Sequence, residues 1–247
     1  MGFMSGKQTH IMVAHLAEKA KQGQKIDLFG YTFDHPVIAE ALTRAAIRGV
    51  IVRLTLNSDE VEGRTNTQNA VPVITEMMRR CEEVRRDQST SKRTLEVWKQ
   101  QGQLIASVYA AWGRRYNASS TKRGPLHAKV FVIGPSKCVP AGEDSRIVVM
   151  GSTNWTLSSE SNAELSVAMQ IGKEGAAGVD HVVRDLRHNA TPVTYAEMLE
   201  RSAARAEGGA QSRPAAEVSG SHGHRGYGVS HRPLQASRSQ NARPLGG

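Results

Sequence analysis

Two short apolar runs separated by a helical pattern place the strongest constraint on the fold of this 247-residue chain. The first run covers residues 26–33, and the second, residues 50–56, is rich in β-branched side chains. Between them, Pro36 stands where a helix would begin and Gly49 where it would end. Two strands joined through a helix normally form a right-handed unit with parallel strands. The pattern therefore predicts an α/β fold, with a mixed β-sheet flanked by helices on both faces.

Further segments extend this alternation of helices and strands. Residues 10–21 carry an apolar stripe with helical spacing, and residues 178–186 also favour a helix. Residues 162–171 begin as a turn and end as an apolar strand. The long stretch 57–125 is expected to be helical and irregular. The segment 134–145, with two prolines and two glycines, is expected to be a loop between two strands.

Polar side chains with a spacing of two residues flank that loop. His127 and Lys129 come before it, and Ser152 and Asn154 follow it. On a strand, residues two positions apart project from the same face. A histidine that attacks phosphorus, beside an ammonium and an amide that hold phosphate oxygens, suits phosphoryl transfer. Taken alone, the His-x-Lys triplet is more typical of a half-exposed strand with a polar outer face than of a catalytic site.

The combination of His127-x-Lys129 with Gly151-Ser152-x-Asn154 resembles the signature of the phospholipase D superfamily. The strand–helix–strand pattern of residues 26–53 resembles the opening of the same fold, so the resemblance covers roughly residues 8–185. It implies a phospholipase D-like fold and a phosphodiesterase.

The resemblance also implies a role for each residue. His127 attacks phosphorus and forms a phosphohistidine, while Lys129 and Asn154 stabilise the non-bridging oxygens. Glu164 orients the histidine, and Ser152 supports the substrate site through hydrogen bonds. A surface carboxylate at a strand start is the alternative interpretation of Glu164. No metal and no cofactor is expected to take part.

The family chemistry uses two His-x-Lys pairs, but only one is present here, because no other histidine has a lysine two positions later. Each chain is therefore expected to hold one half-site, and an isologous homodimer would complete one shared active site. The chain also departs from the signature at Gly134, where the family has an acidic residue. Glu143 or Asp144 is a candidate to replace it.

Positive charge is concentrated before the histidine. Residues 79–123 hold eleven Lys or Arg against four Asp or Glu, a net charge of +7 out of +9 for the chain. Four of these cations approach His127 and are expected to bind a polyanionic substrate: Arg114, Arg115, Lys122 and Arg123. Three aromatic residues lie among them and suit either base stacking or core packing: Tyr109, Trp112 and Tyr116.

The composition changes near residue 206. Residues 1–205 are expected to form the catalytic domain, and residues 206–247 a disordered basic tail rich in Ser, Gly, Arg and Pro. The histidines of this tail lack the cysteine or carboxylate neighbours of a metal site. No apolar run reaches the roughly 20 residues of a membrane span, and the two cysteines do not suggest an oxidising compartment. A soluble intracellular protein is favoured.

Three functions remain open at this point. A nuclease acting on DNA or RNA is favoured by the basic segment, the basic tail and the single motif. A phospholipase D or cardiolipin hydrolase uses the same chemistry on a lipid headgroup, and a membrane surface is then the partner. An inactive phosphate-binding module is the third possibility and is suggested by Gly134.

Overall fold

The computed structural model describes residues 2–62, 70–87, 106–115, 123–135 and 145–211. Within these ranges the strands are β1 (Gly2–Met4), β2 (Lys25–Gly30), β3 (Ile51–Asn57), β4 (Ala106–Arg115), β5 (Arg123–Pro125), β6 (Val130–Gly134), β7 (Arg146–Gly151), β8 (Ser166–Ile171) and β9 (Thr191–Val193). The helices are α1 (Gly6–Lys19), α2 (Pro36–Ile47), α3 (Ser58–Val61), α4 (Ala70–Arg86), α6 (Lys173–Arg187) and α7 (Tyr195–Gln211), with the 3-10 helix η1 (Leu157–Glu160).

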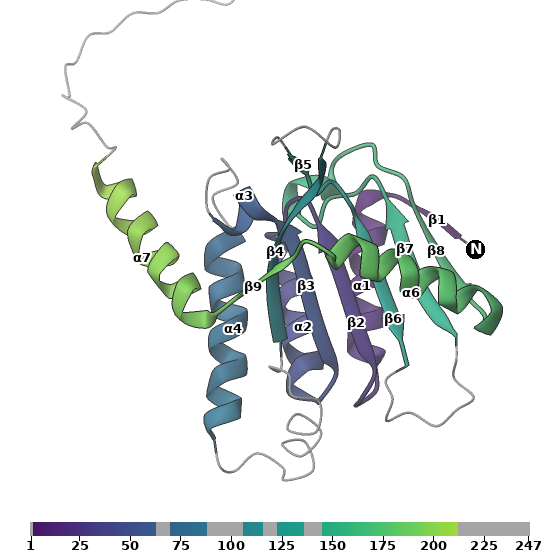
Figure 1. Cartoon of the computed structure of the whole chain (residues 1–247). Coiled ribbons are helices and arrows are strands. Elements are labelled where there is room, and N and C mark those ends of the chain that lie inside the picture. The colour runs from purple at the N-terminus through teal and green to yellow at the C-terminus, as the bar shows by residue number, and fades with distance from the viewer. Residues whose placement is uncertain (1, 63–69, 88–105, 116–122, 136–144, 212–247) are drawn as a thin grey trace, which may run out of the picture. The chain divides into compact units, whose positions relative to one another are not determined.

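All nine described strands belong to one mixed sheet (Figure 1). Its order is β1-β8-β7-β6-β2-β3-β4-β5, and β9 pairs with β4. Strands β2, β3 and β4 are parallel, whereas β6, β7, β8 and β1 pair in antiparallel fashion. The predicted strand–helix–strand unit is confirmed as β2-α2-β3. Gly49 has a positive φ of 92°, which lets the chain leave α2 and enter β3.

Helices cover both faces of the sheet, which confirms the predicted fold class (Figure 1). Residues of α1, α2 and α4 share one core with alternate residues of β2, such as Ile26 and Leu28. On the opposite face, Phe29 and Val132 pack against Val183 of α6. Both faces of the sheet therefore carry an apolar core. Each fully buried Val, Leu, Ile or Phe side chain stabilises the fold by about 1.5–3 kcal/mol.

The structure differs from the sequence prediction in the stretch between α3 and β6. Residues expected to be helical and irregular include α4 but also β4, which pairs with β3 over six residue positions. The strand propensity of β4 is weak because it contains three alanines and a glycine. This segment is a strand because it pairs with β3.

At the other end of the chain, α7 runs to Gln211, so the expected domain boundary at residue 205 falls inside this helix. Residues 212–247, which hold most of the expected basic tail, lie outside the described residues. None of the described helices combines the length and the apolar character that a membrane crossing requires.

Candidate active site

The candidate catalytic residues gather at one end of the sheet. This end carries the carboxyl ends of β2, β3 and β4, and, because β6 is antiparallel to β2, the start of β6 and the end of β7. Segments that leave or enter the sheet here supply the side chains. The hairpin β6–β7 thus brings the two halves of the sequence motif together, as expected.

His127 and Lys129 do not lie on a strand, so that part of the prediction is wrong. They belong to the segment between β5 and β6, whose strand pairing starts only at Val130. The segment is held away from a regular ladder because the Leu126 amide donates to Asn57 Oδ1 over 3.1 Å. The side chains of His127 and Lys129 nevertheless lie close together, as expected.

Lys129 and His127 are in direct contact. The Lys129 Nζ atom lies 2.9 Å from each of the two ring nitrogens of His127. His127 is exposed, whereas Lys129 is only 5% exposed. Partial desolvation of the ring, and secondly the Lys129 ammonium, lower the pKa of His127. The imidazole is therefore kept neutral near neutral pH, which leaves a nitrogen lone pair available for attack.

Glu164 influences this pair from the start of β8. Burial lowers the pKa of Lys129, and the charge of Glu164 opposes that effect. The carboxylate is half-buried and accepts a hydrogen bond of 3.5 Å from Asn162 Nδ2. The charge of Glu164 thus acts on the Lys129 ammonium without a direct hydrogen bond between them.

Ser152 fixes the backbone next to Glu164. Its amide donates to Leu165 O over 3.0 Å, and its hydroxyl accepts from the Leu165 amide over 3.1 Å. The two strands approach closely here, since a Cβ added to Gly151 would lie 2.3 Å from Leu165 O. Only glycine fits at that position. The described contacts of Ser152 are therefore structural.

Asn154 lies directly after this turn and is partly buried. Its backbone oxygen accepts a hydrogen bond of 2.8 Å from Nε2 of His10 on α1. Its side-chain Oδ1 is buried without a partner among the described residues. An orphaned buried acceptor is costly, and it is the Nδ2 group of the same amide that could donate to a phosphate oxygen. No sequence pattern indicates His10, because it lies 144 positions from Asn154.

Trp155 joins the segment after β7 to the segment after β2. Its indole Nε1 donates to Phe29 O over 2.7 Å, and its own carbonyl accepts from the amides of Asp34 and His35. A Cβ added to Gly30 would meet the indole at 2.7 Å, so glycine is required there as well.

Tyr31 is a site residue that the sequence did not reveal. Its ring centroid lies 4.9 Å from that of His127, and Lys129 Nζ lies 5.6 Å from the same tyrosine ring. Its position directly after the carboxyl end of β2 is the signal that could have identified it.

A hollow of about 500 Å³ adjoins His127 and Lys129. Exposed apolar side chains form much of its wall, including Phe3 on β1, Met150 on β7 and Leu165 before β8. The candidate catalytic groups thus border an apolar surface.

The expected polyanion-binding residues can be placed only by their backbone. Arg115 of β4 pairs with Arg123 of β5, and Arg114 precedes it, all near the sheet end that carries the site. The side chains of these arginines, and Lys122 altogether, lie outside the described residues. Trp112 and Tyr116 side chains do so as well, whereas the Tyr109 ring lies 5.3 Å from the Arg187 guanidinium.

Gly134 lies at the opposite end of β6 from Lys129. A Cβ at Gly134 would lie 2.9 Å from the side chain of Arg146, so this position borders an arginine rather than His127. Its candidate replacements Glu143 and Asp144 lie outside the described residues.

One group of described residues has donors suited to a metal ion. His10, His35 and Glu160 present ligand atoms within 4.8 Å of one another. The Nε2 atoms of both histidines are engaged, with Asn154 O and Glu160 Oε1 respectively, and both Nδ1 atoms are buried without a partner. The bond from His10 holds the Asn154 backbone without any ion.

Comparisons with known proteins agree with this geometry. The family model described as cardiolipin synthase, phospholipase D-like domain, matches residues 13–176. NucT from Helicobacter pylori has a similar structure, with a TM-score of 0.52 and 14% identity over 78% of this chain and 98% of NucT. The phospholipase D family member Nuc from Salmonella typhimurium gives 0.50 and 16%, over 78% and 95% respectively. No match was found among curated proteins. Because the family model covers well over half of its length, the chain belongs to the family of phospholipase D-like domains.

Proposed function

We propose that this protein is a phosphodiesterase in which His127 forms a covalent phosphohistidine. The contact between Lys129 Nζ and the His127 ring carries this proposal, because it places a buried cation where a phosphate oxygen would gather charge. Family membership and the signature residues support the same chemistry. They also argue against an inactive binding module, since the attacking and stabilising groups are present together.

The reaction takes place in two steps. The neutral His127 imidazole attacks phosphorus, an N–P bond forms, and the P–O bond to the leaving alcohol breaks. Water then attacks phosphorus and passes its proton to the group that protonated the leaving alkoxide, the N–P bond breaks, and the phosphate monoester is released. Lys129 and the Asn154 amide stabilise the non-bridging oxygens in both steps, while Glu164 limits the loss of charge on Lys129.

The departing alkoxide needs a proton, and a second histidine in the family pattern supplies it. This chain has one His-x-Lys pair, so the second histidine would be His127 of another copy. The apolar rim of the hollow beside His127, formed by Phe3, Met150 and Leu165, supports a contact between copies. We therefore extend the proposal to a two-fold homodimer that shares one active site.

Nucleic acid is the favoured substrate. The segment 79–123 carries a net charge of +7, and the backbones of Arg114, Arg115 and Arg123 lie near the catalytic end of the sheet. A polyanion is attracted to such a surface by the field and by release of counterions. The activity would then be that of an endonuclease on DNA or RNA, without a metal ion in the chemical step.

A phospholipid is the second candidate substrate, and one observation favours it. The exposed apolar side chains of Phe3 and Leu165 border the catalytic hollow, where acyl chains could lie beside a headgroup phosphate. In that case the same His127 chemistry would release the headgroup alcohol.

A parallel assay tests these proposals. Purified protein is incubated in EDTA with single-stranded DNA, RNA, cardiolipin and phosphatidylcholine. The nuclease proposal expects cleavage of a nucleic acid, loss of cleavage in His127→Ala, and retention in His181→Ala, which removes an exposed histidine from α6. Full activity of His127→Ala would refute the mechanism, while cleavage of lipid alone would reassign the substrate.

The dimer is tested separately by mass in solution and by mixing active with inactive chains. An excess of His127→Ala chains should lower the activity of wild-type chains, because a mixed dimer holds only one of the two histidines that the shared site needs. A monomeric protein with full activity would rule out the shared site.

A further inference from the structure

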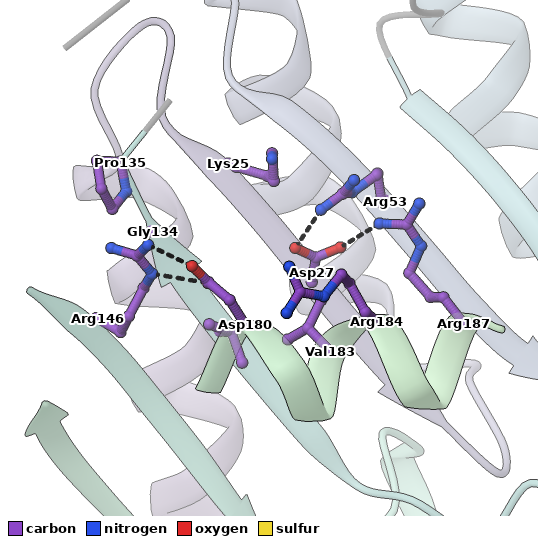
Figure 2. Close-up of a pocket in the computed structure, with 11 residues that line it drawn as sticks. Lys25, Asp27, Arg53, Gly134, Pro135, Arg146, Asp180, Val183, Arg184 and Arg187 are labelled. Carbon is purple, nitrogen blue, oxygen red and sulfur yellow. Dashed lines mark hydrogen bonds and ion pairs between the residues drawn. The ribbon is translucent and has the colours of Figure 1, made fainter. Parts of the chain in front are cut away.

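A second cavity lies beneath α6, at the opposite end of the strands from His127 (Figure 2). Its volume is about 470 Å³. It borders the first residue of β2, the last of β6 and the first of β7, whereas the catalytic groups adjoin the other ends of these strands. The cavity is therefore separate from the candidate active site.

The cavity wall carries more positive than negative charge. Five cationic residues line it, and they are Lys25, Arg53, Arg146, Arg184 and Arg187. Two carboxylates accompany them, Asp27 and Asp180. The wall thus has a net charge of +3.

Both carboxylates are already engaged by arginines (Figure 2). One oxygen of Asp27 accepts from Arg53 at 2.6 Å, and the other from Arg187 at 3.5 Å. Asp180 binds Arg146 through both oxygens, at 3.1 and 2.8 Å. These two carboxylates are therefore already paired and leave the other cations of the wall without a counter-charge of their own.

Hydrogen-bond donors remain in excess around the cavity. The Nε atoms of Arg53 and Arg187 are buried with no partner among the described residues. The Lys25 ammonium and the Arg184 guanidinium also make no hydrogen bond or ion pair with residues that the structure describes. Burial lowers the pKa of Lys25, and the charge of Arg53 lowers it further. Among the described residues, these donors around the cavity therefore lack an acceptor.

We infer that this cavity binds the phosphate group of a small ligand. A phosphate supplies the missing negative charge and several acceptor oxygens, and arginine guanidinium groups match its geometry. The cavity is larger than one phosphate, and Val132, Pro135 and Val183 form an apolar wall that can cover the remainder of a small organic molecule.

A purely structural ion-pair network is the main competing interpretation. Such a network would tie α6 to the sheet through matched charges, as the Arg146–Asp180 pair does. It does not require Lys25 and Arg184, which face the same cavity without a carboxylate of their own (Figure 2). This excess favours a ligand site.

The test uses the full chain carrying His127→Ala and Lys129→Met, so that the catalytic end cannot contribute the same binding. Calorimetric titration is performed with inorganic phosphate, a mononucleotide and the matching nucleoside, with chloride balancing the ionic strength. We expect binding of one phosphate-bearing molecule per chain and no binding of the nucleoside. Arg184→Gln and Lys25→Gln should each weaken binding about tenfold, as expected for loss of one charge-assisted contact.

Two controls make the result decisive. Lys19→Gln removes an exposed cation from α1 on the other face of the sheet and should leave binding unchanged. Arg184 is exposed, so Arg184→Gln should keep its folded state, which thermal unfolding checks. Absence of phosphate binding, or equal affinities in Arg184→Gln and Lys19→Gln, would overturn the inference. Binding of an oligonucleotide alone through Lys25 and Arg184 would also overturn it, because the cavity would then serve a nucleic-acid surface.

Discussion

Buried charged side chains have different partners at the two ends of the sheet. At the end beneath α6, Asp27 lies between two arginines, and its side chain and that of Arg53 are almost fully buried. At the catalytic end, the buried Lys129 contacts a neutral imidazole, and in the described structure Glu164 acts on it only from a greater distance than a hydrogen bond. The Asp27–Arg53 pair therefore stabilises the fold through matched charges, whereas in the proposed mechanism Lys129 stays available for a substrate.

The largest effect is expected from breaking the pair at the α6 end. Asp27→Ala should destabilise the fold by about 3–5 kcal/mol, because it leaves buried Arg53 without compensation. Chemical denaturation measures this. The double replacement Asp27→Leu with Arg53→Met should recover much of the loss, since both charges are then absent. If Asp27→Ala alone were as stable as the wild type, the pair would not be a structural element.

At the catalytic end, Lys129→Met should lower the activity strongly and change the stability little. The free energy of unfolding should change little or increase, because a buried ammonium is removed. The kcat should fall about 10²–10³-fold, as for loss of one group that stabilises the transition state. Steady-state kinetics and denaturation on the same preparation test both parts, with Lys19→Met as the control. A large loss of stability with normal kcat would contradict the comparison.

Tyr31 should have a smaller effect. Tyr31→Ala removes the ring beside His127, and we expect kcat to fall about threefold to tenfold, in line with typical aromatic contact energies. Tyr31→Phe keeps the ring and should retain activity. Equal losses in both variants would instead assign the role to the hydroxyl.

The pH profile gives the finest test. The pKa of His127 is lowered by burial and by Lys129, so the neutral form persists below the ordinary value of about 6.5. The acid limb of kcat/KM should accordingly lie below pH 6.5, with activity rising as the imidazole loses its proton. In Lys129→Met one lowering cause is absent, so the acid limb should move to higher pH. A shift to lower pH would contradict this electrostatic account.

The sequence predicted those features that local patterns encode. The apolar runs around Pro36 and Gly49 indicated β2-α2-β3, and the paired motifs indicated that His127 and Asn154 adjoin one hairpin. Strand β4 was missed because pairing with β3, rather than propensity, creates it. The position of the His-x-Lys segment before β6 was missed because the side chain of distant Asn57 holds it there.

Other site features depend on contacts that no local pattern reveals. His10 reaches Asn154 from α1, and Tyr31 reaches His127 from the end of β2. The place of Gly134 in the fold also depends on such contacts, because the five residues of β6 put this glycine next to Arg146, away from Lys129.

Trp155 has a mechanical consequence for the site. Its indole is bonded to the end of β2, and its carbonyl to the segment that follows Tyr31. Trp155 thus ties the segment after β7 to the segment after β2. These two segments, which flank His127, cannot separate without breaking three hydrogen bonds. In the proposed dimer, the cleft would therefore widen by movement between rigid subunits, and the subunit contact would set the thickness of substrate that can enter.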